Sequence, residues 1–100
     1  MYKLFLDDLR DPPGDDFVVA RTSCEAIDIV SRRGMPGFIS FDHDLGGDDT
    51  AIVFINAIIE KVLDRELIFP NGFSYRIHSA NPVGSENIRS KMDCTLKHLS

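Results

Sequence analysis

Short apolar runs alternate with stretches of helical periodicity along most of the chain. Four of the runs are mostly apolar and only four or five residues long, which is typical of buried strands. They span Tyr2–Leu6, Phe17–Ala20, Phe38–Phe41 and Phe73–Ile77. Polar or ionisable residues follow directly after most of them. The pattern therefore predicts four strands that end in polar loops.

The segment after the second strand carries the signals of a helix from about Ser23 to Arg33. Thr22 and Glu25 have the spacing of a capping box, in which each side chain satisfies a free backbone amide of the first turn. Gly34 provides a stop, because glycine readily adopts the conformation that ends a helix.

Two further helices follow the third and fourth strands. The middle helix is expected to be the longest, with Asp48 or Asp49 as its N-cap. Its apolar stripe is predicted on Ile52, Ile55, Ile59, Val62 and Leu63, widened by Val53, Phe54 and Ile58. The last helix begins with Asn81 as N-cap and Pro82 at the first helical position. Its buried side is predicted to carry Ile88, Met92, Leu96 and Leu99.

The alternation of strands and helices predicts one α/β domain over residues 1–100, with four mostly parallel strands and three helices. The first connection is unusual, because the segment Leu9–Asp16 contains two prolines and is too short for a crossover helix. Either the second strand runs antiparallel to the first, or an irregular loop makes the crossing. The sequence leaves both possibilities open.

Composition narrows the range of functions. The chain has 100 residues and a net charge of −5, which argues against binding along an extended nucleic-acid duplex but permits a small phosphorylated ligand held through a metal. No apolar run is long enough for a membrane span, and the first residues lack the basic segment that is typical of a secretory signal. Cys24 and Cys94 are expected to be reduced, buried thiols of a cytoplasmic protein.

Ionisable side chains gather where the strands end. Asp7 and Asp8 follow the first strand, and Asp42, His43 and Asp44 follow the third. Parallel strands bring their C-terminal ends to one edge of the sheet, where the four carboxylates would repel one another. A divalent cation would relieve that repulsion, and carboxylate oxygens suit Mg²⁺ or Mn²⁺. Caps or turns are the alternative explanation of these acidic residues.

An anion site is predicted after the fourth strand. His78 and Ser79 end that strand, and the segment Asn81–Gly84 starts the next helix, where backbone amides can bind phosphate. His43 and His78 are candidates for a general acid or base near neutral pH. Arg10 and Arg21 are interpreted as surface ion-pair partners or as phosphate ligands, and His98 as a solvated end residue.

The acidic pair and Asp42 resemble the site of response-regulator receiver domains, where the pair binds Mg²⁺ and the later aspartate accepts a phosphoryl group. Ser79 would match the receiver's Ser/Thr. The chain departs from ordinary receivers in three ways. The helix between the first two strands is missing, the receiver's lysine has no counterpart, and His43-Asp44 follows Asp42.

A closer resemblance is to the cyclic-phosphate-processing receiver domains, small receivers of bacteria and phages. It rests on three motifs, which are Leu4–Arg10 with Pro12-Pro13, Ile39–Gly46, and His78–Gly84 with Asn87-Ile88. The family implies a compact, three-layer, flavodoxin-like fold and a role with cyclic phosphate ends in RNA repair.

The resemblance also implies roles for single residues. Asp7, Asp8 and Asp42 would hold the metal, with Asp44 in or beside its coordination shell. Asp42, His43 and His78 would be catalytic, and Ser79, Asn81, Gly84 and Arg10 would bind phosphate.

These residues predict a metal-dependent phosphoesterase whose partner is a small phosphorylated ligand or an RNA end. Three alternatives remain. Asp42 could be a phosphoacceptor in signalling, or the chain could bind a nucleotide or a protein without chemistry. A haloacid-dehalogenase-like phosphatase is the third, because Asp42-His43-Asp44 follows a strand as that family's Asp-x-Asp motif does.

Overall fold

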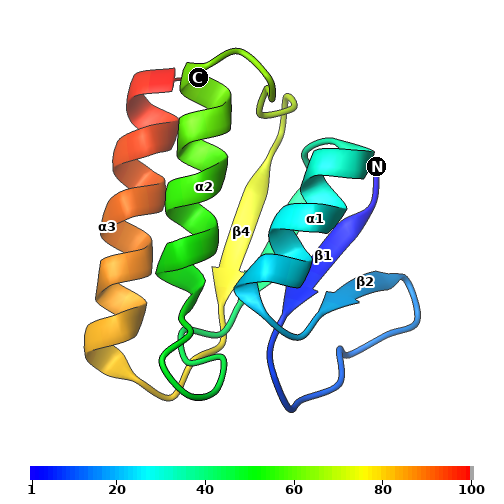
Figure 1. Cartoon of the computed structure of the whole chain (residues 1–100), viewed down its shortest axis with the longest axis vertical. Helices are drawn as coiled ribbons and strands as arrows, with labels where there is room; N and C mark the ends of the chain where they lie inside the picture. Colours follow the sequence, from blue (N-terminus) through cyan, green and yellow to red (C-terminus); the bar gives the residue numbers. More distant parts are fainter. Residues whose placement is uncertain (100) are drawn as a thin grey trace.

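The computed structural model describes residues 1–99, with the backbone alone at position 99 (Figure 1). In chain order the elements are β1 (Lys3–Leu6), β2 (Phe17–Ala20), α1 (Ser23–Arg33), β3 (Phe38–Phe41), α2 (Ala51–Leu63), β4 (Ser74–Ile77) and α3 (Pro82–Leu99). The four predicted strands and three predicted helices are confirmed. The bounds of β2, β3 and α1 agree with the prediction, and β1 and β4 begin one residue later.

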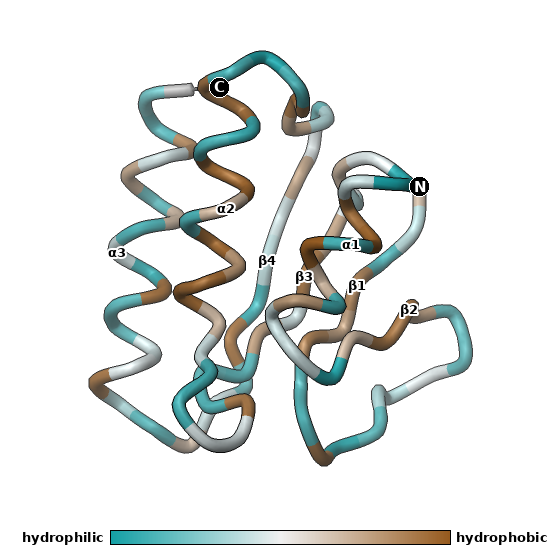
Figure 2. The backbone as a smooth tube through the Cα atoms, in the orientation of Figure 1, coloured by the Kyte–Doolittle hydropathy of each residue, from teal (hydrophilic) through white to brown (hydrophobic). Residues whose placement is uncertain are grey.

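The strands form one sheet in the order β2-β1-β3-β4, and every neighbouring pair is parallel. The orientation of β2, which the sequence leaves open, is therefore settled. An irregular loop over residues 7–16 joins two parallel strands that lie side by side. The loops beyond the strand ends are mostly hydrophilic in Figure 2, as expected for segments that meet water.

All three helices pack against one face of the sheet. Leu4 and Leu6 of β1 join the apolar core with buried residues from α1, α2 and α3, whereas Phe5 points the other way and lies outside that core. Alternation along the strands puts Phe38 and Ser40 on the same side as Phe5. The α/β receiver-like class is thus confirmed, but the described residues form two layers in place of the three expected. Within residues 1–99, no helix packs against the second face of the sheet.

The middle helix differs from its prediction in length and rotation. α3 has 18 residues and α2 has 13, so α2 is not the longest helix. The buried residues of α2 are Ala51, Phe54, Ile55 and Ile58, while Val53 and Leu63 are exposed. Because α2 is apolar on nearly every side, its periodicity does not show which side meets α1, α3 and the sheet.

Two of the three predicted helix caps are confirmed. The Thr22 hydroxyl accepts a hydrogen bond from the Glu25 amide at 3.0 Å, and Asn81 Oδ1 accepts one from the Gly84 amide at 2.9 Å. The third predicted cap is wrong, because the N-cap of α2 is Thr50 and not Asp48 or Asp49. Asp49 instead accepts hydrogen bonds from the amide and hydroxyl of Ser23. It thereby links the loop before α2 to the start of α1.

The remaining predictions concern single residues at the surface and in α3. Cys24 and Cys94 are free but exposed, which corrects the expectation that they are buried. Both lie on outward-facing positions of helices whose inner faces are already filled. Ile88 and Met92 are buried as predicted, whereas the side chain of Leu99 lies outside the described residues. Within residues 1–99, no helix combines the length and apolar character that crossing a membrane requires.

Candidate functional site

The candidate site begins where the parallel strands end in register. Leu6, Phe41 and Ile77, the last residues of β1, β3 and β4, lie side by side. Beyond them the amides of Asp42 and His78 still donate to carbonyls of the neighbouring strands, at 2.8 and 2.9 Å. The ladder therefore extends by one residue, and it places Asp7, Asp42 and His78 in one row at the edge of the sheet.

Three carboxylates meet at this edge. Asp7, Asp8 and Asp42 each offer an oxygen atom, and the three atoms lie within 4.8 Å of one another. Asp7 is only 1% exposed, and the other two are partly buried. Burial raises the pKa of Asp42, and the negative charge of Asp7 raises it further, although a hydrogen bond from Ser79 opposes both effects. This concentration of negative charge fits a divalent cation with oxygen ligands.

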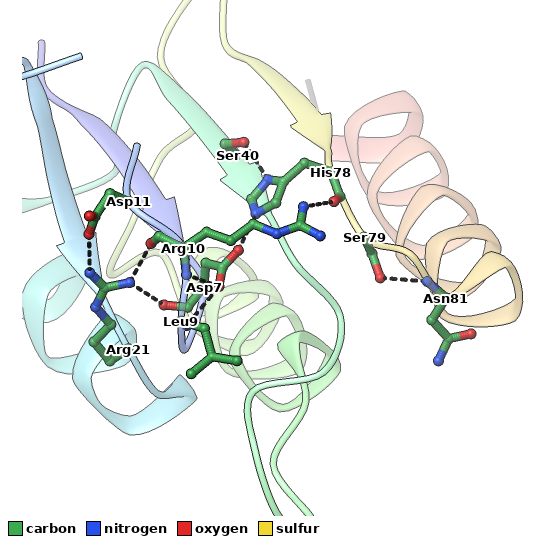
Figure 3. A network of polar contacts seen from close by, with 9 residues as sticks. All are labelled: Asp7, Leu9, Arg10, Asp11, Arg21, Ser40, His78, Ser79 and Asn81. Atoms are coloured by element: carbon green, nitrogen blue, oxygen red, sulfur yellow. Dashed lines mark hydrogen bonds and ion pairs between the residues drawn. The ribbon is translucent and has the colours of Figure 1, made fainter. Parts of the chain in front are cut away.

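Asp7 is fixed by its surroundings (Figure 3). Its Oδ1 atom accepts hydrogen bonds from the amides of Leu9 and Arg10, at 2.8 and 2.9 Å. Its Oδ2 atom lies 2.9 Å from Nε2 of His78. Burial acts to raise the pKa of Asp7, but the two amides and the histidine outweigh it, so that the pKa lies below the usual value. Asp7 is therefore an anchored, ionised carboxylate.

His78 connects this carboxylate to the uncovered face of the sheet. Its Nδ1 atom lies 2.7 Å from the Ser40 hydroxyl, and its ring stacks on Phe5 with centroids 4.8 Å apart. Both ring nitrogens are thus engaged within the protein, which suits a residue that orients Asp7. Ser40 was not among the predicted site residues. In the sequence, Ser40 is marked only by being the one polar residue of β3. The alternation of side chains along the strand points it away from the core.

A hollow of about 590 Å³, here called the acidic hollow, opens beside the carboxylates. It is lined by Asp8, Leu9, Arg10, Asp42, Asp44, Gly46, Gly47, Ser79, Ala80 and Asn81. Most of the predicted metal and phosphate residues therefore share one cavity. Neither His43 nor His78 is among the lining residues.

Asp44 lies in the wall of the acidic hollow but outside the cluster of three carboxylates. Its Oδ1 atom is 3.0 Å from His43 Nδ1, and its Oδ2 atom accepts a hydrogen bond from the Asn81 amide group at 3.2 Å. The contact with His43 is the larger cause that lowers the pKa of Asp44, and the hydrogen bond from Asn81 lowers it further. Asp44 therefore ties the loop after β3 to the start of α3.

Ser79 and Asn81 line the acidic hollow, whereas Gly84 is not among its lining residues. The Ser79 hydroxyl accepts a hydrogen bond from the Asn81 amide at 3.1 Å (Figure 3). The Gly84 amide already donates to the Asn81 side chain, so it is not free for phosphate. A Cβ atom at Gly84 would lie 2.4 Å from Cγ of His43. Glycine is therefore needed there for the close approach of the His43 ring.

The two arginines differ in their surroundings. Arg21 pairs with Asp11 at 3.0 Å and donates to the carbonyl of Asp7 at 3.2 Å, which confirms its interpretation as an ion-pair partner. Arg10 donates to the carbonyl of His78 at 3.1 Å and also lines the acidic hollow. Of the two, Arg10 is the one placed to meet an anionic ligand.

Comparison with known proteins gives one family. A family model described as the cyclic-phosphate processing receiver domain matches residues 2–94. No curated protein and no solved structure was found to be similar to the chain. The matched span includes all the strands, the acidic hollow and most of α3.

Proposed function

The chain belongs to the cyclic-phosphate processing receiver domains, and we propose that it is a metal-dependent phosphoesterase. Its proposed substrates are cyclic or terminal phosphates of nucleotides or RNA ends. The observation that carries the proposal is the convergence of Asp7, Asp8 and Asp42 beside a hollow that also presents a hydroxyl, an amide and a guanidinium. The proposed location is the cytoplasm, where the two exposed cysteines would stay reduced.

Asp7, Asp8 and Asp42 are the proposed ligands of Mg²⁺ or Mn²⁺. A bound cation would neutralise charge on the phosphoryl oxygens and lower the pKa of the attacking water. Burial, and after it the charge of Asp7, raises the pKa of Asp42, and a bound cation would offset both effects by stabilising the ionised carboxylate. Asp44 is held by His43 and Asn81, and its proposed role is to shape the cavity.

The protein's own residues would orient the phosphate. Ser79 and Asn81 line the same hollow as Asp8 and offer a hydroxyl and a side-chain amide. Arg10 closes one side with a guanidinium that suits phosphate oxygens. We assign His78 to holding Asp7, because both of its nitrogens are engaged. His43 remains the proposed acid or base, and its Nδ1 atom contacts Asp44, which lines the hollow.

One observation favours a second function. Asp42 accepts a hydrogen bond from Ser79 and lies beside an acidic pair, an arrangement that also suits an aspartate that accepts a phosphoryl group. No lysine lines the acidic hollow among the described residues, so Arg10 would have to balance the charge of an aspartyl phosphate. Treatment with acyl-phosphate donors followed by intact-mass measurement separates the two functions. Stable phosphorylation that Asp42→Asn abolishes would favour the phosphoacceptor.

The proposed activity is tested by turnover of 2′,3′-cyclic nucleotides and of an oligonucleotide with a cyclic-phosphate end. Each is incubated with Mg²⁺, with Mn²⁺ and with a chelator. Asp42→Asn removes a proposed ligand, and Asp64→Asn removes the same charge from the exposed end of α2 as a control. Chelator-sensitive product that is lost only in Asp42→Asn would support the proposal. Product that persists in Asp42→Asn, or no product with either metal, would refute it.

A further inference from the structure

The face of the sheet that carries no helix presents aromatic rings and cations. We call it the open face and define it by Lys3, Phe5, Phe17, Phe38, Ser40 and Arg76. Together with His78 and with Arg10, Asp11, Pro13, Gly14 and Asp16 of the loop between β1 and β2, these residues line a hollow of about 570 Å³. This volume is within the usual range of small-ligand sites. Phe17, Phe38 and Arg76 have no part in the phosphate chemistry proposed above, whereas Phe5 and Ser40 contact His78. The composition of the open face therefore calls for a separate explanation.

The three phenylalanines form a continuous aromatic surface across three strands. The ring of Phe17, on the edge strand β2, contacts the ring of Phe5 on β1 and that of Phe38 on β3, with centroids 5.8 and 6.1 Å away. Phe5 is only 4% exposed, but Phe17 and Phe38 are partly exposed. Partly exposed aromatic rings on a sheet are surfaces on which the bases of single-stranded nucleic acids stack.

Cations border these rings although the chain as a whole is acidic. Lys3 Nζ lies 5.4 Å from the centre of the Phe17 ring and 2.9 Å from Asp16. The side chain of Arg76 is exposed and, within residues 1–99, makes no hydrogen bond or ion pair. An unpaired guanidinium beside aromatic rings complements an anionic backbone that carries stacking bases.

The open face adjoins the acidic hollow. Arg10 lines both cavities. His78 lines the cavity of the open face, stacks on Phe5 and touches Asp7 with its Nε2 atom. One ligand can therefore lie on the open face and present its end to the carboxylates.

We propose that the open face is the base-binding subsite for a single-stranded RNA end. Bases would stack on Phe17 and Phe38, and the unpaired Arg76 would bind a backbone phosphate, whereas Lys3 stays paired with Asp16. This inference rests on the proposed function, because the acidic hollow is taken to receive the phosphate at the end of the strand. It goes further in making single-stranded RNA, and not a free mononucleotide phosphate, the preferred substrate.

The test is fluorescence anisotropy with a labelled RNA of about six nucleotides that ends in a 3′-hydroxyl, in chelator and at low salt. These conditions remove both the metal and the reacting phosphate. Phe38→Leu removes a ring but keeps an apolar side chain, and Arg76→Gln changes only an exposed residue. Arg32→Gln, on the exposed side of α1, is the control for lost charge.

We expect about tenfold weaker binding for Phe38→Leu and Arg76→Gln, and wild-type affinity for Arg32→Gln. A duplex of the same sequence should not compete. Equal affinities for all four proteins would overturn the inference. So would a dimer in sedimentation that Arg76→Gln disrupts without any RNA binding, because the open face would then be a protein interface. Turnover tests the proposed function separately, so either idea can fail while the other stands.

Discussion

Replacement of Asp42 by asparagine should make the metal-free protein more stable while abolishing its response to metal. The oxygens of Asp7 and Asp42 lie within 4.8 Å of each other. Two negative charges at that distance repel by about 3.5 kcal/mol at an effective dielectric constant of about 20, and by about 1 kcal/mol in water. Because Asp42 is partly exposed, we expect the lower end of this range. Asparagine removes the charge and keeps an oxygen that can accept the Ser79 hydrogen bond.

A gain of about 1 kcal/mol corresponds to a rise of roughly 4–8 °C in Tm for a domain of this size. The effect has a defined pH dependence. The pKa of Asp42 is raised in the folded protein, so protonation of Asp42 favours folding. Its contribution to the free energy of unfolding is therefore largest in acid and is lost as pH rises through the raised pKa. The advantage of Asp42→Asn should therefore appear at neutral pH and disappear in acid.

Calorimetric unfolding in chelator, at neutral and acidic pH, measures this difference. Addition of Mg²⁺ or Mn²⁺ at about 100 times its Kd should then stabilise the wild type by about 2.7 kcal/mol and leave Asp42→Asn unchanged. Asp64→Asn, which removes a distant exposed charge, should behave as the wild type. A variant that is less stable than the wild type in chelator at neutral pH, or that responds equally to metal, would refute the reasoning.

Two other substitutions test the supports of the site. Gly84→Ala should lower the free energy of unfolding by about 1–3 kcal/mol, because the new Cβ would lie 2.4 Å from His43 Cγ; urea denaturation measures this, and an unchanged midpoint would contradict it. Ser40→Ala should cost about 1 kcal/mol and change the nitrogen NMR shifts of His78, whose Nδ1 atom loses its partner at 2.7 Å; unaltered shifts would show that the contact does not form in solution.

Local signals in the sequence account for most of the elements and for the centre of the site. The apolar runs at Phe17–Ala20 and Phe38–Phe41 are bounded by polar or turn residues, and the Thr22 cap fixes the start of α1. Parallel strands end at one edge of the sheet, which predicts that Asp7, Asp8 and Asp42 share that edge, and the pairing of β1 with β3 brings them together.

The features that could not be predicted depend on contacts between distant segments. Phe5 and Phe38 are as apolar as their neighbours Leu4 and Ile39, so the strands alone do not reveal that one face lacks helices. Asp49 is an ordinary cap candidate in the sequence, but it bonds to Ser23, 26 positions earlier. The uncovered face and the Asp49 contact therefore become visible only in the folded structure.

The most direct test of the central claim is anomalous scattering from crystals grown with Mn²⁺ and a 2′,3′-cyclic nucleotide. We predict one strong manganese peak within coordination distance of Asp7, Asp8 and Asp42, with the phosphate between that peak and Ser79. Crystals of Asp42→Asn grown in the same way should show no peak there. A wild-type structure with the nucleotide bound and no manganese among these three carboxylates would contradict the account.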